Sequence, residues 1–217
     1  NSAQTLGGTL ASLGEGLAAG LIRDLTISDG GSEDTTCRIA EAAGARVISA
    51  PAGRGSQLGR GARDTEGAWL LFLHADTQLG SGWAEEVAEH LAGFTGPACF
   101  HLRFRTSGFA ARAVATWANL RTRLFSLPYG DQGILIRRED YVRAGGFRDI
   151  ALMEDVALVR ALPKVRLLGA VASTDAGRYL ADGWIWRGAL NLSILIRYLF
   201  GADPDHLARV YTRNPRP

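Results

Sequence analysis

Short apolar segments alternate with helical segments in this chain, and that alternation limits the fold more than any other feature. The predicted elements of the first half are strands at 21–28, 46–50 and 69–75 and helices at 37–45, 56–67 and 82–92. An opening amphipathic helix is predicted by leucines at helical spacing, Leu6, Leu10, Leu13 and Leu17. Such alternation produces βαβ units, in which helices cover both faces of a sheet. We therefore expect an α/β fold with a Rossmann-like, mostly parallel sheet.

The second half keeps strands and helices in a less regular order. Its predicted elements are strands at 97–105, 133–138 and 164–169 and helices at 110–125, 138–147, 153–162, 184–200 and 204–211. We expect residues 1–180 to form the main domain and residues 181–217 to be a C-terminal amphipathic helical extension of it. Nucleotide-binding α/β sheets normally open with a strand, whereas this chain opens with a helix. We therefore expect a first strand that this sequence does not include.

Composition narrows the functional classes. A chain of 217 residues that is 47% hydrophobic can bury one sizeable core. A net charge of +2 does not demand a nucleic-acid partner, although it suits an anionic substrate. The two cysteines, Cys37 and Cys99, lie far apart in the sequence. We interpret them as reduced thiols of a cytoplasmic protein.

A glycine turn with an acidic residue follows the first predicted strand, in the sequence ISDGGSEDTT. Asp29 lies just past the apolar part of that strand, at the edge where open α/β sheets bind ligands. Gly30 permits a tight turn with close backbone approach. A simpler alternative is a strand–helix turn with a helix cap, and the turn alone favours this alternative.

A loop of glycines and arginines, PAGRGSQLGRGAR, opens the next predicted helix. It lacks the Gly-Lys-Ser/Thr ending of a P-loop and the dinucleotide-binding fingerprint. Arg54, Gly55 and Arg60 near a helix start would nevertheless suit a diphosphate. A solvated helix that carries arginines is an equally good explanation of the loop alone.

A histidine and an aspartate end the strongly apolar segment WLLFLHADT. If the strand continues to this point, His74 and Asp76 project from the same face. An imidazole and a carboxylate placed together can bind a divalent cation that bridges phosphate oxygens. The spacing alone favours a simpler explanation, in which the histidine bonds to a helix-capping aspartate.

Further polar residues occur in MEDVALVRAL and YGDQGILIRR. Glu154 and Asp155 begin a predicted helix, where they either compensate the helix dipole or supply a general base. Asp131 and Gln132 lie in a turn bracketed by glycines, which could form a polar rim beside those acids. Neither motif is specific by itself.

The order of these motifs is more specific than any one of them. A strand-end Asp-Gly-Gly-Ser-x-Asp is followed by an Arg/Gly loop, an apolar strand ending in x-Ala-Asp, a Gly-Gly-Phe and a Glu-Asp. This order resembles the family-2 glycosyltransferases, which have the GT-A fold, from residue 1 to about residue 165. The motifs LFLHADT, GDQGILIRR and LMEDV are similar to those of a bacterial subgroup.

The resemblance implies a metal-dependent, inverting transfer of a sugar from a UDP- or GDP-linked donor to a hydroxyl acceptor. It implies that Asp29 contacts the nucleoside base, with Gly30 beside it. Asp76 would ligate Mn²⁺ or Mg²⁺, and His74 and Ala75 would lie at the nucleotide sugar. The remaining donor-side residues that it implies are Arg54, Gly55 and Arg60, together with Arg178 as a later diphosphate-binding arginine.

The resemblance also implies residues for catalysis and for the acceptor. Asp155, with Glu154, would take the place of the acidic pair that includes the catalytic base, and Gly130, Asp131 and Gln132 would lie on the acceptor side. His74 departs from the family pattern, which usually has aspartate there, so it is either a second metal ligand or a nucleotide contact. Two other functions stay open, namely a sugar nucleotidyltransferase and a non-catalytic nucleotide-sugar-binding module.

The C-terminal segment WIWRGALNLSILIRYLF has a wide apolar face with scattered arginines. One interpretation is a helix that lies on the inner face of the membrane and presents a lipid-linked acceptor. The other, which we favour at this point, is a helix that packs on the core or on the second subunit of a homodimer. Its apolar part, 189–200, is shorter than the roughly 20 residues that span a bilayer.

Overall fold

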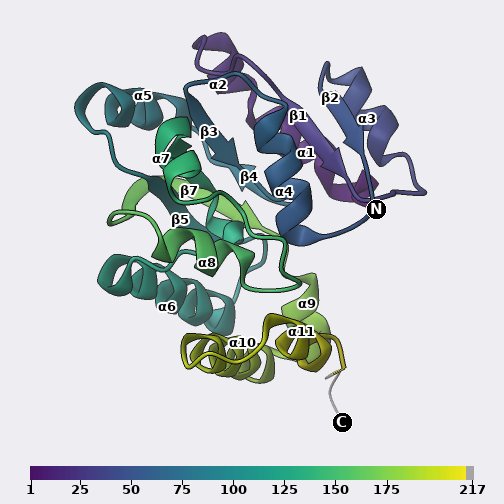
Figure 1. The fold of residues 1–217 in the computed structure, drawn as a ribbon, viewed down its shortest axis with the longest axis vertical. Helices are drawn as coiled ribbons and strands as arrows, with labels where there is room; N and C mark the ends of the chain where they lie inside the picture. Colours follow the sequence, from purple (N-terminus) through teal and green to yellow (C-terminus); the bar gives the residue numbers. More distant parts are fainter. Residues whose placement is uncertain (214–217) are drawn as a thin grey trace.

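The computed structural model describes residues 1–213, and its first sheet has two parallel strands. Strands β1 (Thr26–Asp29) and β2 (Arg46–Ser49) pair with Thr26 opposite Arg46. The helices α1 (Ala3–Ser12) and α3 (Thr36–Ala42) pack on each other beside this sheet, and α4 (Arg54–Arg63) contacts β1. A short helix α2 (Gly14–Ala18) follows α1. Figure 1 shows this unit at the N-terminal side of the molecule.

The second sheet has five strands in the order β3-β6-β5-β7-β4. These strands are β4 (Gln78–Leu79), β3 (Trp69–Phe72), β5 (Ala98–Phe104), β6 (Ile134–Arg137) and β7 (Arg166–Thr174). The β5·β7 pair is parallel, whereas β3·β6, β5·β6 and β4·β7 are antiparallel. The prediction of parallel pairing is confirmed for β1·β2 and β5·β7. The three pairs that involve β4 or β6 are antiparallel instead, because these two strands run opposite to their neighbours.

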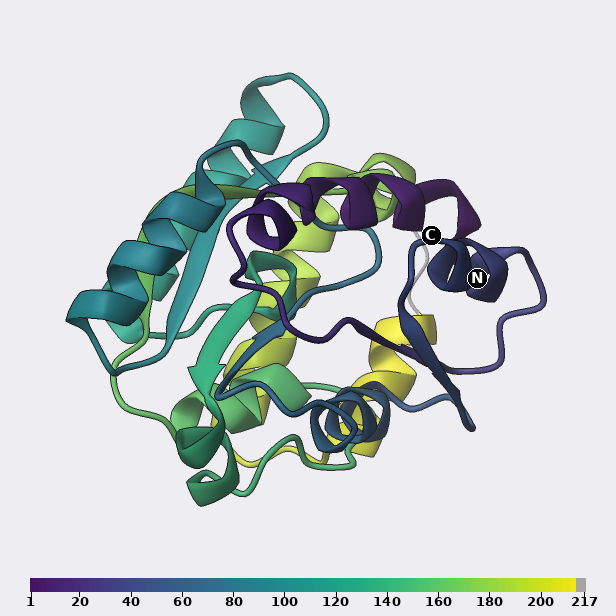
Figure 2. The ribbon, with the colours of Figure 1, turned by 90° about the horizontal axis from the view of Figure 1, so that it is seen from above.

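Helices cover both faces of the five-stranded sheet. On one face, α5 (Trp83–Gly93) packs Trp83 and Val87 against Ala98 and Phe100 of β5. On the other face, α7 (Arg138–Arg143) and α8 (Glu154–Arg160) enclose Cys99, which alternates with those two residues along β5. Figure 2 shows the strands between these layers. The predicted α/β class with flanking helices is therefore confirmed.

The C-terminal helices pack beside α8 and α6 (Phe109–Phe125). They are α9 (Gly177–Asp182), α10 (Trp184–Leu199) and α11 (Pro204–Arg213). Val156 of α8 is completely buried against Ile194 of α10 and Leu207 of α11. The last four residues of the predicted 181–217 extension lie outside the described residues. Within residues 1–213, no helix has both the length and the apolarity needed to cross a bilayer.

Candidate functional site

A cleft of about 1250 Å³ opens between the two sheets. Its inner part lies between β1 and β3, which belong to different sheets, since β1 pairs with β2 and β3 pairs with β6. Apolar side chains such as Leu25, Ile27 and Leu71 line this part. Its polar end lies beyond the last residues of β3. The predicted site residues that line this cleft are Arg54, His74, Ala75, Asp76, Gly130, Asp131, Glu154, Asp155 and Arg178. Segments up to 124 residues apart in sequence therefore meet at one polar surface.

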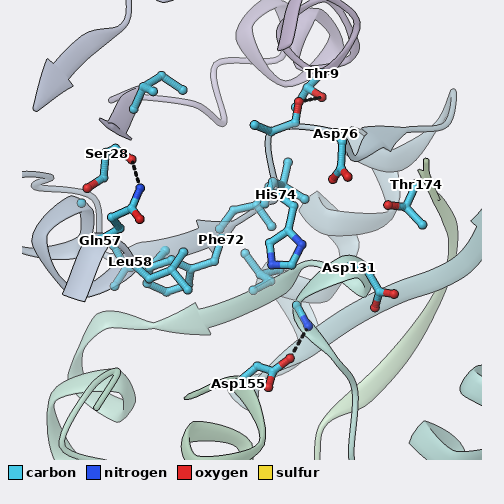
Figure 3. Close-up of a pocket in the computed structure, with 18 of the residues that line it drawn as sticks. Thr9, Ser28, Gln57, Leu58, Phe72, His74, Asp76, Asp131, Asp155 and Thr174 are labelled. Carbon is cyan, nitrogen blue, oxygen red and sulfur yellow. Dashed lines mark hydrogen bonds between the residues drawn. The ribbon is translucent and has the colours of Figure 1, made fainter. Parts of the chain in front are cut away.

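His74 and Asp76 lie in a turn, because β3 ends at Phe72. The premise that a continuing strand gives them a common face is therefore wrong. The turn still directs both into the cleft, since the Thr77 amide donates to the His74 carbonyl at 3.0 Å and the Thr9 hydroxyl donates to the Ala75 carbonyl at 3.0 Å. Asp76 Oδ1 is buried and has no hydrogen-bond partner. Figure 3 shows His74 between Asp76 and Asp155.

The short 3₁₀ turn η1 (Gly130–Gln132) packs against His74. A Cβ atom on Gly130 would lie 2.5 Å from Nε2 of His74, so only glycine lets the turn come this close. Asp131 lines the cleft, and its buried Oδ1 has no hydrogen-bond partner. Burial raises the pKa of Asp131, while the nearby charges of His74 and Arg121 oppose that rise. The turn thus places an acid beside the His74 and Asp76 pair.

If His74 serves the chemistry of this cleft, Gly130→Ala is expected to lower kcat/KM by about tenfold or more, because a small displacement of a group at the reacting centre can cost that much. The added methyl group must push the His74 ring away from its place in the cleft. Steady-state kinetics would measure the loss. Gly188→Ala is the matched control, since a Cβ at Gly188 in α10 meets no atom within 4 Å. Equal activity of the two variants would show that the position of His74 does not matter.

The acids Glu154 and Asp155 open α8, and a strained residue precedes them. Met153 is buried with φ at 67°, in the left-handed region that side chains other than glycine rarely adopt. Asp155 accepts hydrogen bonds at both oxygens, from the Gly130 amide at 2.8 Å and from the Val156 amide at 2.7 Å. These bonds orient its carboxylate at the cleft wall. Strain of this kind is maintained where a side chain must be held in a set direction.

Glu154 is paired with Arg54 across the cleft wall. The Arg54 Nε donates to Oε1 of Glu154 at 2.7 Å, and the glutamate is buried while the arginine is partly exposed. Burial and the adjacent Asp155 raise the pKa of Glu154, and Arg54 opposes that rise. Glu154 therefore holds the guanidinium of Arg54 at the cleft. Gly55 does not line the cleft, since it packs closely on the Arg148 carbonyl.

Asp29 and Gly30 lie outside the lining of the cleft. Asp29 is buried, and its Oδ2 accepts from the amides of Gly31 and Ser32 at 2.8 and 2.9 Å. Burial opposes ionisation, but the hydrogen bonds from Ser32 and Gly31 outweigh it and lower the pKa of Asp29. In this structure the residue shapes its own turn. Nearby, the Ser28 hydroxyl is buried without a partner, and Ser28 does line the cleft.

Two other expected residues also point elsewhere. Arg60 does not line the cleft, and its guanidinium donates to the Pro51 carbonyl at 3.0 Å. Gln132 is completely buried, where its amide oxygen accepts from Thr122 at 2.8 Å and its amide nitrogen donates to Phe100 at 3.2 Å. Gln132 therefore supports the turn from the core side, while its neighbours Gly130 and Asp131 face the cleft.

The C-terminal helices supply cleft residues that the sequence did not identify. These are Tyr179, Arg187, Asn191 and Tyr211. Arg187 is buried, lies 4.1 Å from the centre of the Tyr211 ring and pairs with Asp182 at 3.0 Å, while Asn191 donates to the Tyr179 hydroxyl at 2.9 Å. Burial raises the pKa of Tyr179 to about 12, so it stays a neutral phenol at ordinary pH. Two signals in the sequence had pointed to this region, namely the expected diphosphate contact of Arg178 and the amphipathic pattern of 184–200.

A family model and several solved structures resemble this chain. The family model described as glycosyl transferase family 2 matches residues 1–148. Glucosyl-3-phosphoglycerate synthase from Mycobacterium tuberculosis, in complex with Mn²⁺, UDP and phosphoglyceric acid, has a similar fold, with a TM-score of 0.53 and 23% identity over 81% of this chain. The chain spans 66% of the length of that protein. No functionally curated protein matches the chain significantly.

Two more solved structures share the fold. One is a mycobacterial protein, with a TM-score of 0.56 and 22% identity over 89% of this chain and 71% of the other. The other is mannosyl-3-phosphoglycerate synthase from Rubrobacter xylanophilus, with a TM-score of 0.52 and 19% identity over 93% and 72%. At such identities the likeness concerns the fold, and it confirms the predicted GT-A architecture.

Proposed function

This chain belongs to glycosyl transferase family 2, and from that premise we propose that it transfers a sugar, with inversion, from a nucleoside-diphosphate sugar to a hydroxyl acceptor. One observation carries the proposal: acidic, imidazole and guanidinium groups from the turn after β3 and from α4, η1 and α8 converge on one cleft. The chain is thus a glycosyltransferase. A protein of similar fold was crystallised in complex with Mn²⁺ and UDP-glucose, which supports a UDP-linked donor, with a GDP-linked donor as the alternative.

The residues at the end of β3 fit a divalent cation in part. Asp76 offers a buried oxygen without a partner, and His74 lines the same cleft. Across residues 1–213, no group of three or more His, Cys, Asp or Glu side chains could enclose a metal ion. We propose that Asp76 and His74 would hold Mn²⁺ or Mg²⁺ when the nucleotide sugar is bound. Such a cation neutralises the charge that develops on the departing diphosphate.

Arg54 and Asp155 have separate roles in this proposal. Arg54, held by Glu154, faces the diphosphate and stabilises its negative charge, and Arg178 of the cleft lining assists it. Asp155 takes the proton of the acceptor hydroxyl. The acceptor oxygen then forms a bond to the anomeric carbon, and the bond from that carbon to the diphosphate breaks, so that the nucleoside diphosphate leaves. Glu154 acts only through Arg54 in this proposal and is therefore a positioning residue.

We propose that the acceptor enters beside α9, α10 and α11. Asp131, Tyr179 and Asn191 line this part of the cleft and offer polar groups to a hydroxylated molecule. We also propose that residues 181–217 extend the catalytic domain, which is supported by the shared core of Val156, Ile194 and Leu207. The free thiols of Cys37 and Cys99 suit the cytoplasmic location that we propose.

A thermal-shift screen of UDP- and GDP-sugars, with Mn²⁺ or with a chelator, tests the donor class. Ligand at about 100 times its Kd stabilises the folded state by about 2.7 kcal/mol. For a chain of this size that corresponds to a rise in Tm of roughly 5–10 °C. We expect a rise that requires both the sugar nucleotide and the metal, followed by release of the nucleoside diphosphate when an acceptor is present. Stabilisation without turnover would indicate a binding module, and pyrophosphate release from a nucleoside triphosphate would indicate a nucleotidyltransferase.

A further inference from the structure

The outward faces of α6 and α10 carry large apolar side chains at helical spacing. On α6 the exposed residues Phe109, Trp117, Leu120, Leu124 and Phe125 follow this pattern. On α10 and just after it, the exposed residues are Ile185, Trp186, Leu192, Ile196, Leu199 and Phe200. The two helices contact each other and lie side by side in Figure 1. We call the exposed apolar residues of these two segments the α6–α10 face.

The apolar character of α10 extends around most of the helix. Its inner side already buries Leu190, Ile194 and Leu195 in the core shared with α8 and α11. On the opposite side, Ile185 is 89% exposed and Phe200 is 90% exposed. A helix with apolar residues on nearly all sides is normally buried on all sides. The α6–α10 face therefore exposes apolar surface to water unfavourably, and it suits a partner of low polarity.

The charges on the two segments all have one sign. Residues 109–125 and 184–200 contain five arginines and neither aspartate nor glutamate. Arg112, Arg123 and Arg197 are exposed, whereas Arg121 and Arg187 are buried. Of the acids that flank these segments, Asp182 pairs with Arg187 and Asp203 accepts from the amides of Asp205 and His206, whereas the Asp205 side chain is exposed. Within the two segments, the exposed charges beside the apolar side chains are therefore all positive.

We propose that the α6–α10 face docks on a lipid bilayer that contains anionic headgroups. Helices that lie in a membrane interface combine an apolar face of Trp, Phe and Leu with basic residues. A twofold dimer through this face would bring the same arginine-only surface against itself, whereas anionic lipid complements that charge. The docking surface lies on the outside of the molecule, so this proposal is independent of the chemistry proposed for the cleft.

Vesicle flotation of the whole chain tests the proposal. We expect binding to phosphatidylcholine vesicles that contain phosphatidylglycerol, weaker binding to pure phosphatidylcholine, and weakening by added salt. Leu192→Gln combined with Ile196→Gln should lower the partition coefficient by about tenfold or more, because two apolar side chains lose their favourable burial. The matched control combines Leu17→Gln with Val142→Gln, since both are exposed apolar residues of other helices.

Three results would overturn the proposal. The first is no binding to anionic vesicles at low salt, and the second is an equal loss of binding in the control variant. The third is a dimer by sedimentation velocity that the Leu192→Gln/Ile196→Gln variant dissociates while vesicle binding is absent, which would assign the face to a second copy of the chain. Circular dichroism and Tm should remain unchanged in both variants, because all four side chains are exposed.

Discussion

Asp155→Asn is expected to lower kcat by about 10²–10⁴-fold, the range that a general base contributes. The Asp155 carboxylate is oriented by the amides of Gly130 and Val156, and it lines the cleft. Asparagine keeps the size of the side chain but cannot take a proton from the acceptor. It also has one carbonyl oxygen for two amide donors, so folding is weakened by about 1–3 kcal/mol. Turnover should therefore be measured with Tm recorded in parallel.

Glu154→Gln is the matched comparison for this prediction. It removes the adjacent charge and weakens the bond from Arg54 to Glu154, but it leaves the Asp155 carboxylate in place. We expect it to raise the KM for the donor more than it lowers kcat, because Arg54 acts on the diphosphate. Near-normal turnover by a folded Asp155→Asn variant would exclude Asp155 as the base. A larger loss of kcat in Glu154→Gln would transfer that role to Glu154.

The local pattern of the sequence was sufficient for most of the fold. Residues 109–125 form a helix that repeats small buried residues, Ala111, Ala115 and Ala118, at helical spacing, and the prediction of 110–125 is nearly identical. Strand β4 (Gln78–Leu79) was missed because two residues are too few to show a pattern. The direction of β6 was also not predictable. It depends on long-range pairing of Ile134 with Phe72, not on the residues of β6 itself.

The sequence predicted cleft residues where a motif faces the cleft. It did not predict them where tertiary contacts determine which way a side chain points. Gly130 and Gln132 are two residues apart, yet one touches His74 and the other lies in the core with Thr122. Their positions in the sequence do not show which residue faces the cleft and which faces the core, since a 3₁₀ turn points successive residues in different directions. Tyr211 reaches the cleft only because α11 folds back along α10. A motif search along the chain has no means to detect such a contact.

Asp76→Asn is expected to lower Mn²⁺-dependent turnover by about 10³-fold, since a metal ion stabilises developing charge by several kcal/mol. The buried Oδ1 of Asp76 is without a protein partner, which suits an oxygen that serves an external cation. An amide is a weaker ligand for Mn²⁺ than a carboxylate. Electron paramagnetic resonance of Mn²⁺ with UDP should show the loss of affinity directly. That readout does not depend on knowing the acceptor.

Asp175→Asn is the control, because Asp175 is another carboxylate of the cleft lining but is about half exposed. It should leave both Mn²⁺ affinity and turnover close to normal. His74→Asn then separates the two roles open to that residue. If His74 is a ligand, this variant weakens Mn²⁺ binding as Asp76→Asn does. If His74 contacts the nucleotide, Mn²⁺ affinity stays near normal while the KM for the sugar nucleotide rises. Unchanged Mn²⁺ affinity in both variants would mean that the cation site does not lie at the end of β3.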